Sequence, residues 1–422
     1  MTHREFLFHL ERFGIKLGLE NISHLLEVLG KPHQCFPSIH VAGTNGKGSV
    51  LAMVDAVLRN AGYTTGRYTS PHLIALNERM LFNGVPISDD ELEDQLGVVR
   101  AVAEKMETLP TFFEFLTAVA FRWFAEKRVD VALIEVGMGG RFDATNVICP
   151  EATAITNIDL EHTKYLGDTL GKIAFEKAGI IKSRVPVVVT EKKTEPLEVI
   201  RKRAELMQSP AFLLDRDFDY VFHGQALHRL FEYHGMNINL PPVRLGLGGA
   251  HQGDNAAASA ALCEVLMERF SNIGMSAITK GLAEAKWPCR LERVLENPPV
   301  IIDVAHNTAG AVRLAQELEE CVLLLGVSSD KAADQMIQVL APKAREIILT
   351  QFTGPRALPI DRLCEAAGPL RYHRTLQLAD ALDLGMRLAS KDLPLVITGS
   401  IFLAGEARRL LIERYGAKPL QF

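Results

Sequence analysis

The stretch His40–Val50, with the sequence HVAGTNGKGSV, joins an apolar strand-like segment to a helix-forming segment through three closely spaced glycines. It predicts a strand, a tight loop over residues 43–49 and a helix. Several backbone N–H groups of such a loop can face one anion, and the helix start adds partial positive charge. Lys47 supplies a full charge for the outer phosphates of a nucleotide, and the Ser49 hydroxyl is placed for a magnesium ion. The alternative is a tight turn with a solvated lysine, which the agreement of strand, glycines and helix disfavours.

The overall composition limits the classes of partner and compartment. The chain has 422 residues, 48% hydrophobic and 23% charged, with a formal net charge of −5. This length predicts two or three domains, and the absence of a dense Lys/Arg stretch argues against a nucleic-acid partner. The six cysteines are scattered without a Cys-x-x-Cys pair, which is typical of reduced thiols in a cytosol. No apolar run is long enough for a membrane span and the N-terminus is no signal peptide, so we expect a cytoplasmic protein.

Strands and helices alternate along most of the chain, which indicates an α/β fold with mostly parallel sheets. The segment Val129–Val136 lacks polar alternation, as expected for a parallel strand covered on both faces. Residues 218–247 change to short β-like pieces with glycines and prolines, which predicts a small antiparallel sheet. Breaks around residues 287–299 indicate a domain boundary. We therefore expect a phosphate-loop domain over residues 1–296 and a smaller doubly wound α/β domain over residues 297–422.

Three further polar residues have both a functional and a structural interpretation. Glu135 ends a predicted strand before a glycine-rich loop, where open α/β sheets bind ligands. It is a candidate for the magnesium role of a Walker B acid, and the alternative is a solvated strand-end acid. His162 also follows a strand end, and such a histidine is either a metal ligand or a structural residue. By its pattern alone, Lys177 is a surface lysine of a helix over residues 168–181.

Nine short motifs together resemble the folylpolyglutamate synthase/dihydrofolate synthase family, a branch of the Mur-type amide ligases. In chain order they are HVAGTNGKGS, TSPHL, EVGMGGRFDATN, HTKYLG, EKAGI, HQGDNAAAS, RLE, DVAHN and TGSIFLAGE. The resemblance runs from about residue 17 to residue 406 and implies a P-loop ATP-binding domain followed by a smaller Rossmann-like domain. It also implies an ATP-dependent ligase that joins L-glutamate to a pteroate or folate acceptor, in a site between the two domains.

The resemblance assigns a role to individual residues of this chain. ATP would be held by Gly46, Lys47, Gly48, Ser49, Asn255, Arg290 and Asp303. The magnesium ligands, for two ions, would be Ser49, Ser70, Glu135, His162 and Lys177, the last carried as a carbamate (N6-carboxylysine). The pterin acceptor would be lined by Leu17, Gly18, Leu19, Thr111, Phe112, Phe113, Glu114, Phe142, Asp143 and Ala144, and the incoming glutamate would meet His306 and Ser400. Lys47, His162 and Lys177 would be the catalytic residues.

The chemistry of amide ligation explains these residue types. A carboxylate is a poor acylating agent, so ATP must first convert it into an acyl phosphate. The transferred phosphoryl group needs positioning and charge neutralisation, which Lys47 and magnesium supply. A second magnesium near His162 would bridge the acceptor carboxylate and the γ-phosphate, two anions that otherwise repel each other. Protonated Lys177 would repel magnesium, whereas a carbamate offers this hard cation oxygen ligands.

The chain departs from the family pattern at several positions. Four departures leave the ATP chemistry intact: Glu161 for an aspartate, Cys289 for a glycine, Thr308 for a proline, and Ala332 after Asp330-Lys331. Two bear on the acceptor: Lys16 where bifunctional bacterial members often carry an acid, and Asn21 where arginine is common. We expect both dihydrofolate synthase and folylpolyglutamate synthase activity, with polyglutamylation alone as the alternative.

Three other functions remain as alternatives. A peptidoglycan-precursor synthetase would need a nucleotide-sugar domain before the phosphate loop, and only 42 residues precede Gly43. A P-loop kinase or NTPase switch would explain Lys47 and Glu135, but it leaves the ligand-type residues of the second half unused. A non-enzymatic ATP sensor predicts binding without turnover. Because one chain holds the whole predicted site, we expect a monomer whose partners are small molecules.

Overall fold

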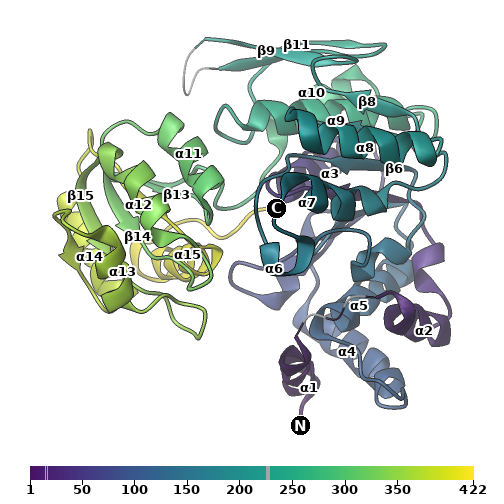
Figure 1. Ribbon diagram of the computed structural model, residues 1–422, viewed down its shortest axis with the longest axis horizontal. Helices are drawn as coiled ribbons and strands as arrows, with labels where there is room; N and C mark the ends of the chain where they lie inside the picture. The colour runs from purple at the N-terminus through teal and green to yellow at the C-terminus, as the bar shows by residue number, and fades with distance from the viewer. Residues whose placement is uncertain (15, 17, 225–228) are drawn as a thin grey trace.

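The computed structural model describes residues 1–14, 16, 18–224 and 229–422 and arranges them in two α/β units that lie side by side (Figure 1). The larger unit holds an eight-stranded sheet and a separate three-stranded sheet, and the smaller unit holds a six-stranded sheet. This architecture confirms the predicted fold class. Within the described ranges, no helix combines the length and the apolar character that crossing a membrane requires.

The eight-stranded sheet of the larger unit is parallel apart from one edge. Its strands, in the order of the sheet, are β4 (Val85–Pro86), β3 (Met80–Phe82), β2 (Thr65–Tyr68), β5 (Val131–Glu135), β1 (Ser38–Ala42), β6 (Ala152–Ile155), β7 (Val187–Val189) and β8 (Ala211–Leu213). The strands β3 and β4 are antiparallel and were missed by the sequence prediction, because strands of three and two residues are too short to give a pattern. Strand β1 is central, and every residue of β1 and β5 is buried. A parallel strand covered on both faces explains the apolar runs in the sequence.

Helices of the larger unit cover both faces of this sheet. They are α1 (His3–His9), α2 (Glu20–Val28), α3 (Lys47–Asn60), α4 (Asp89–Ala103), α5 (Phe112–Lys127), α6 (Thr163–Leu166), α7 (Leu170–Lys177), α8 (Thr194–Leu206), α9 (Gln252–Leu266) and α10 (Met275–Glu284). Ile39 and Val41 of β1 pack in one core with α3, α9 and α10, whereas Ile134 of β5 packs in another core with α4 and α5. Short 3₁₀ turns of this unit lie at Leu10–Phe13, Pro32–Gln34, Leu76–Arg79, Ala144–Val147 and Ala178–Ile180, and another lies in the smaller unit at Ala341–Lys343.

The segment predicted as a small antiparallel sheet forms one. Its strands are β9 (Asp219–His223), β10 (Leu230–His234) and β11 (Asn239–Val243), in the order β11-β10-β9. Tyr220 packs so closely on α9 that a Cβ added at Gly253 would lie 2.4 Å from its ring. The sheet is therefore attached to the larger unit through α9.

The smaller unit is a second, mostly parallel sheet between helices. Its strands, in the order of the sheet, are β12 (Glu292–Glu296), β13 (Pro299–Ile302), β17 (Leu395–Thr398), β14 (Cys321–Leu325), β15 (Ala344–Leu349) and β16 (His373–Arg374). Its helices are α11 (Thr308–Glu317), α12 (Ala333–Leu340), α13 (Ile360–Ala367), α14 (Leu378–Leu388) and α15 (Ile401–Tyr415). Strand β12 is antiparallel to β13, so residues 292–296 belong to this sheet although they precede the predicted boundary after residue 296.

The two units touch through several segments. A Cβ added at Gly405 of α15 would lie 2.0 Å from the carbonyl oxygen of Leu73, so the backbones meet closely at this point. The chain then returns from α15 to the larger unit, where the Phe422 and Trp287 rings lie 6.1 Å apart. These contacts hold the carboxyl ends of the central strands of the larger unit close to the second unit.

Candidate active site

The phosphate loop follows β1 as predicted, and its glycines are required by what surrounds them. Gly46 has a φ of 92°, in the left-handed region, and a Cβ there would lie 2.3 Å from the Asn255 side-chain oxygen. A Cβ at Gly48 would lie 2.8 Å from the Trp287 ring. Glycine at these two positions lets α9 and the segment between the units approach the loop. Phosphate binding alone does not predict this close packing.

Lys47, the first residue of α3, lies over the phosphate loop. Its ammonium donates to the carbonyl oxygens of Gly43 and Thr44 at 3.1 and 3.2 Å, and it lies 3.8 Å from Glu135 Oε1. Lysine is a flexible cation, so these contacts leave it free to turn towards an anion that enters the loop.

Glu135 ends β5 with its carboxylate facing the same loop. It is 6% exposed, and its Oε2 accepts a hydrogen bond from the backbone N–H of Ser70 at 3.1 Å. Burial raises the pKa of Glu135 above its ordinary value, and the nearby Lys47 opposes that shift. A buried carboxylate beside a lysine and two serine residues is suited to a cation bound together with an anion.

These residues line a cavity of about 200 Å³, which we call the phosphate-loop cavity. It brings together Gly46, Lys47, Gly48, Ser49, Ser70, Glu135, His162, Asn255, Arg290, Asp303 and His306. Arg290 and Asp303 come from the segment between the units and from the end of β13. The two Asp303 oxygens accept from the backbone N–H groups of Leu291 and Ala305 at 2.9 and 2.8 Å, which fixes the carboxylate.

Cys289 has an unusual backbone at the start of this junction. Its φ is 58°, in the left-handed region where glycine costs least, and its side chain is fully buried. A glycine would adopt this backbone at the lowest cost. In this chain the buried thiol packs in the core of the second unit.

A second cavity, of about 370 Å³, lies beside the first, and we call it the aromatic cavity. Most of the residues expected around the acceptor line this cavity: Gly18, Thr111, Phe113, Glu114, Phe142, Asp143 and Ala144. His306 and Ser400, expected near glutamate, line it from the second unit. Phe112 and Leu19 instead pack against the core of α2 and α5, and Leu17 lies outside the described residues.

The two cavities share a wall. Ser70, Pro71, Gly137, Glu161, His162, His306 and Ile401 line both of them. A group at the phosphate loop and a group in the aromatic cavity can therefore meet at these side chains. This arrangement suits the transfer of a group from one bound molecule to another.

His162 and Lys177 both lie close to the phosphate loop. His162, with a φ of 52°, immediately precedes α6, and burial is the main cause of its lowered pKa. Lys177 is only 5% exposed, and its ammonium donates to the Gly43 carbonyl oxygen at 2.8 Å. Burial and the neighbouring Lys47 lower the pKa of Lys177 to about 7, so the surface lysine suggested by the sequence pattern is wrong.

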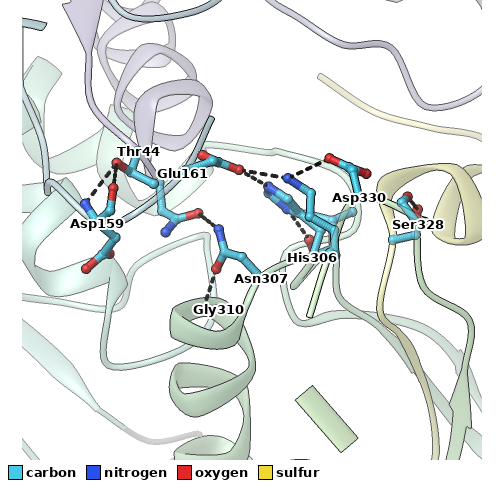
Figure 2. A network of polar contacts seen from close by, with 12 residues as sticks. Thr44, Asp159, Glu161, His306, Asn307, Gly310, Ser328 and Asp330 are labelled. Carbon is cyan, nitrogen blue, oxygen red and sulfur yellow. Dashed lines mark hydrogen bonds and ion pairs between the residues drawn. The ribbon is translucent and has the colours of Figure 1, made fainter. Parts of the chain in front are cut away.

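The sequence did not predict how the units are joined across the site (Figure 2). The Glu161 Oε1 atom, from the larger unit, lies 3.3 Å from His306 Nε2 and 3.2 Å from Lys331 Nζ of the second unit. The Asn307 side-chain amide donates to the Asn45 side-chain oxygen at 3.3 Å. These partners are far apart in the sequence, so only the folded chain reveals their pairing.

The metal prediction can be tested against the donor set. Across the described ranges, no three His, Cys, Asp or Glu side chains are grouped so that they could hold a metal ion. Magnesium bound with a nucleotide needs fewer, because one or two carboxylates suffice when phosphate oxygens and water complete its shell. Ser49, Ser70 and Glu135 line one cavity and offer such oxygen ligands. The residues present therefore fit a magnesium–nucleotide complex and not a metal held by protein alone.

Comparison with known proteins agrees with this arrangement. A family model described as the Mur ligase middle domain matches residues 41–263, and one described as the Mur ligase, glutamate ligase domain matches residues 289–401. The chain is 37% identical over 414 residues to a dihydrofolate synthase/folylpolyglutamate synthase of Bacillus subtilis, spanning 95% of this chain and 96% of the relative. It is 35% identical over 403 residues to a folylpolyglutamate synthase of Lacticaseibacillus casei, spanning 92% and 93%.

A solved structure supports the same assignment. The folylpolyglutamate synthase of Mycobacterium tuberculosis, solved with ADP and AMPPCP, superimposes with a TM-score of 0.89 at 34% identity, covering 99% of this chain and 100% of that one. Matches of this extent include both units and the segment between them. The chain therefore belongs to the Mur ligase family and, within it, to the dihydrofolate synthase/folylpolyglutamate synthase group.

Proposed function

We propose that this chain is an ATP-dependent ligase that joins L-glutamate to two kinds of carboxylate acceptor, dihydropteroate and reduced folates. The observation that carries the proposal is the wall shared by the phosphate-loop cavity and the aromatic cavity. It lets the γ-phosphate end of ATP meet the carboxylate of an acceptor whose flat ring lies among phenylalanines. The name of the Bacillus subtilis relative contains both activities.

The nucleotide end of the reaction depends on positioning. The N–H groups of Gly46, Gly48 and Ser49 would surround the phosphates, and Lys47 would turn from the loop carbonyls to the outer phosphates. Asn255, Arg290 and Asp303 line the same cavity and are assigned to the rest of the nucleotide. The second unit thus supplies part of the ATP site.

Magnesium would be held by Ser49, Ser70 and Glu135, with His162 beside a second ion. When bound, it would neutralise the charge of the phosphates and of the acceptor carboxylate. The protein's part is to keep Glu135 ionised and aimed at the cavity, which its hydrogen bond from the Ser70 N–H supports.

Lys177 is assigned as a carbamate. Its neutral amine would attack the carbon of CO₂, forming an N–C bond and releasing one proton, so that the side chain ends in a carboxylate. Burial favours the neutral amine that this step requires. The product would replace a positive charge beside Gly43 by oxygen ligands for the cation.

The acceptor and glutamate would meet in the aromatic cavity. The acceptor carboxylate attacks the γ-phosphorus of ATP, and ADP leaves; the glutamate amine then attacks the acyl phosphate, and phosphate leaves. His306 and Ser400 are assigned to glutamate. The Ser400 hydroxyl lies 3.1 Å from the Ser328 hydroxyl on the cavity wall, so both can reorient to bind a substrate oxygen.

Phosphate release from MgATP tests the proposal. Glutamate is supplied with one acceptor at a time, either dihydropteroate or a reduced folate monoglutamate, and we expect acceptor-dependent release with both. Release with neither acceptor, or ATP hydrolysis that needs no acceptor and no glutamate, would refute the ligase assignment for these substrates.

Polyglutamylation alone is the second candidate. It is favoured by Lys16, which lines the aromatic cavity, and by Asn21, whose amide donates to Glu114 Oε2 at 3.3 Å. These are the two acceptor-side departures from the bifunctional pattern, and the Lacticaseibacillus casei relative is named for this activity alone. Release with the folate but not with dihydropteroate would select this function. Exchange of Lys16 for glutamate and of Asn21 for arginine should then restore use of dihydropteroate.

The remaining assignments concern the state of the protein in the cell. One chain supplies residues for both cavities, which supports a monomer, and light scattering at several protein concentrations tests that state. The scattered thiols support a cytoplasmic location.

A further inference from the structure

Two side chains of the second unit, His306 and Lys331, converge on one oxygen of Glu161. The distances from Glu161 Oε1 are 3.3 Å to His306 Nε2 and 3.2 Å to Lys331 Nζ. The side chains of Glu161 and Lys331 are only 11% and 16% exposed. Glu161 belongs to the loop between β6 and α6 of the larger unit, so this contact crosses between the units (Figure 2).

The hydrogen bonds show what each ring nitrogen of His306 faces. His306 Nδ1 lies 2.9 Å from the carbonyl oxygen of Val304, which can only accept. Nε2 faces the Glu161 carboxylate, which also accepts when ionised. The Glu161 carboxylate is therefore bound by the Lys331 ammonium and contacted by the His306 ring.

A second acid does not replace Glu161 beside Lys331. Asp330 Oδ2 lies 3.4 Å from Lys331 Nζ, but the Asp330 side chain is 63% exposed, so solvent screens this pair. Without Glu161, Lys331 would present a poorly compensated positive charge beside the His306 ring inside the aromatic cavity, which both residues line.

We propose that Glu161 is a specificity-determining residue that occupies the position of a substrate carboxylate, and that a carboxylate of the incoming glutamate displaces it from His306 and Lys331. The inference rests on the proposed function, because it takes glutamate as the second substrate. The Glu161 carboxylate and the substrate carboxylate are the same chemical group, so His306 and Lys331 can exchange one for the other. Displacement of Glu161 also breaks one contact between the units, which couples glutamate binding to their relative movement.

The exchange makes Glu161 an internal competitor of glutamate. Its removal should therefore tighten glutamate binding, whereas removal of a residue that merely supports the site would weaken it. We expect Glu161→Gln to lower the KM for glutamate about fivefold to tenfold, the range of a partly buried ion pair that no longer competes. Lys331→Met should raise this KM. When Glu161→Gln is added to Lys331→Met, it should lower the KM for glutamate much less than it does in the parent chain.

The experiment measures initial rates against glutamate concentration at saturating MgATP and acceptor, for both single variants and the double variant. Glu104→Gln is the matched control, since it removes the same group from an exposed pair with Arg100 on α4 and should leave the KM unchanged. A glutamate KM that rises or stays the same in Glu161→Gln overturns the proposal. The parent chain distinguishes failure of the proposed function from failure of the exchange. If the parent chain does not use glutamate, the proposed function is refuted. If the parent chain turns over normally and Glu161→Gln does not lower the KM for glutamate, only the exchange is refuted.

A binding measurement covers the case in which Glu161→Gln binds but turns over slowly. Equilibrium dialysis of labelled glutamate, with a non-hydrolysable ATP analogue present, should give a lower Kd for Glu161→Gln than for the parent chain. If Glu161→Gln does not fold, Glu161→Asp takes its place, because a side chain shorter by one carbon reaches His306 and Lys331 less well and should also lower the Kd. Unchanged or weaker binding in the folded variant overturns the proposal.

Discussion

Replacement of Lys177 by alanine tests the most unusual assignment in the site. In an exposed lysine with the ordinary pKa of 10.5, about one side chain in three thousand is neutral at pH 7. With a pKa of about 7, half of the Lys177 side chains are neutral at that pH. The environment of Lys177 therefore raises the supply of reactive amine about a thousandfold. Lys177→Ala removes both the amine and the carbamate, and we expect kcat to fall at least about a hundredfold.

The carbamate should be visible and replaceable. With ¹³C-labelled bicarbonate, the parent chain should show a carbamate resonance that Lys177→Ala lacks, and acetate or formate should restore part of the lost activity. Because the pKa is lowered, the neutral amine predominates above pH 7 and the ammonium below it. Activity at one low, fixed concentration of dissolved CO₂ should therefore be lower at pH 6 than at pH 8.

A lysine on the same helix provides the control. Lys172 is 63% exposed and pairs with Asp168 at 2.8 Å, so Lys172→Ala should keep both the resonance and the activity. Full activity of Lys177→Ala without added carboxylate would falsify the carbamate role. The same resonance in Lys177→Ala would assign the modification to another amine.

Substitutions at three further residues test separate parts of the structure. Asp55→Asn should lower the free energy of unfolding by about 3–5 kcal/mol in a denaturant titration, because it removes the carboxylate that lies 3.5 Å from the buried guanidinium of Arg67. A loss below about 1 kcal/mol would contradict this. Glu135→Gln should lower kcat about a hundredfold or more with little change in Tm, because glutamine keeps the shape of the side chain and the hydrogen bond from the Ser70 N–H but not the charge. Activity near that of the parent chain would show that Glu135 takes no part in the reaction. Asn307→Ala should cost about 1 kcal/mol, because Asn307 caps α11 and contacts Asn45. Asn307→Ser should recover the cap alone, and equal stability of the two variants would rule out capping.

The local parts of the site could be predicted from the sequence. The strand, glycine loop and helix around Lys47 are continuous in the chain, and Glu135 ends an apolar run. Each feature of this kind depends on neighbouring residues, so its pattern is visible without the fold. The antiparallel sheet after residue 218 was predicted for the same reason, from its turn residues.

The parts that depend on distant contacts could not be predicted. Glu161 and Lys331 are 170 positions apart, and either alone resembles a surface charge. The fit of Trp287 over Gly48 likewise needs the two units in place. Strand β12 was not predicted, because the prolines that follow it are typical of a linker. In the folded chain it pairs with β13.

The hydrogen bond between Asn45 of the phosphate loop and Asn307 at the start of α11 has a thermodynamic consequence. If a nucleotide in the loop changes the free energy of this contact, it changes the relative stability of the arrangements of the two units. By linkage, a second ligand that favours one arrangement must then change the affinity for the nucleotide. The nucleotide changes the affinity for that second ligand by the same factor. The order in which the substrates bind would affect the rates of the steps, and the product of their affinities would be the same by every route.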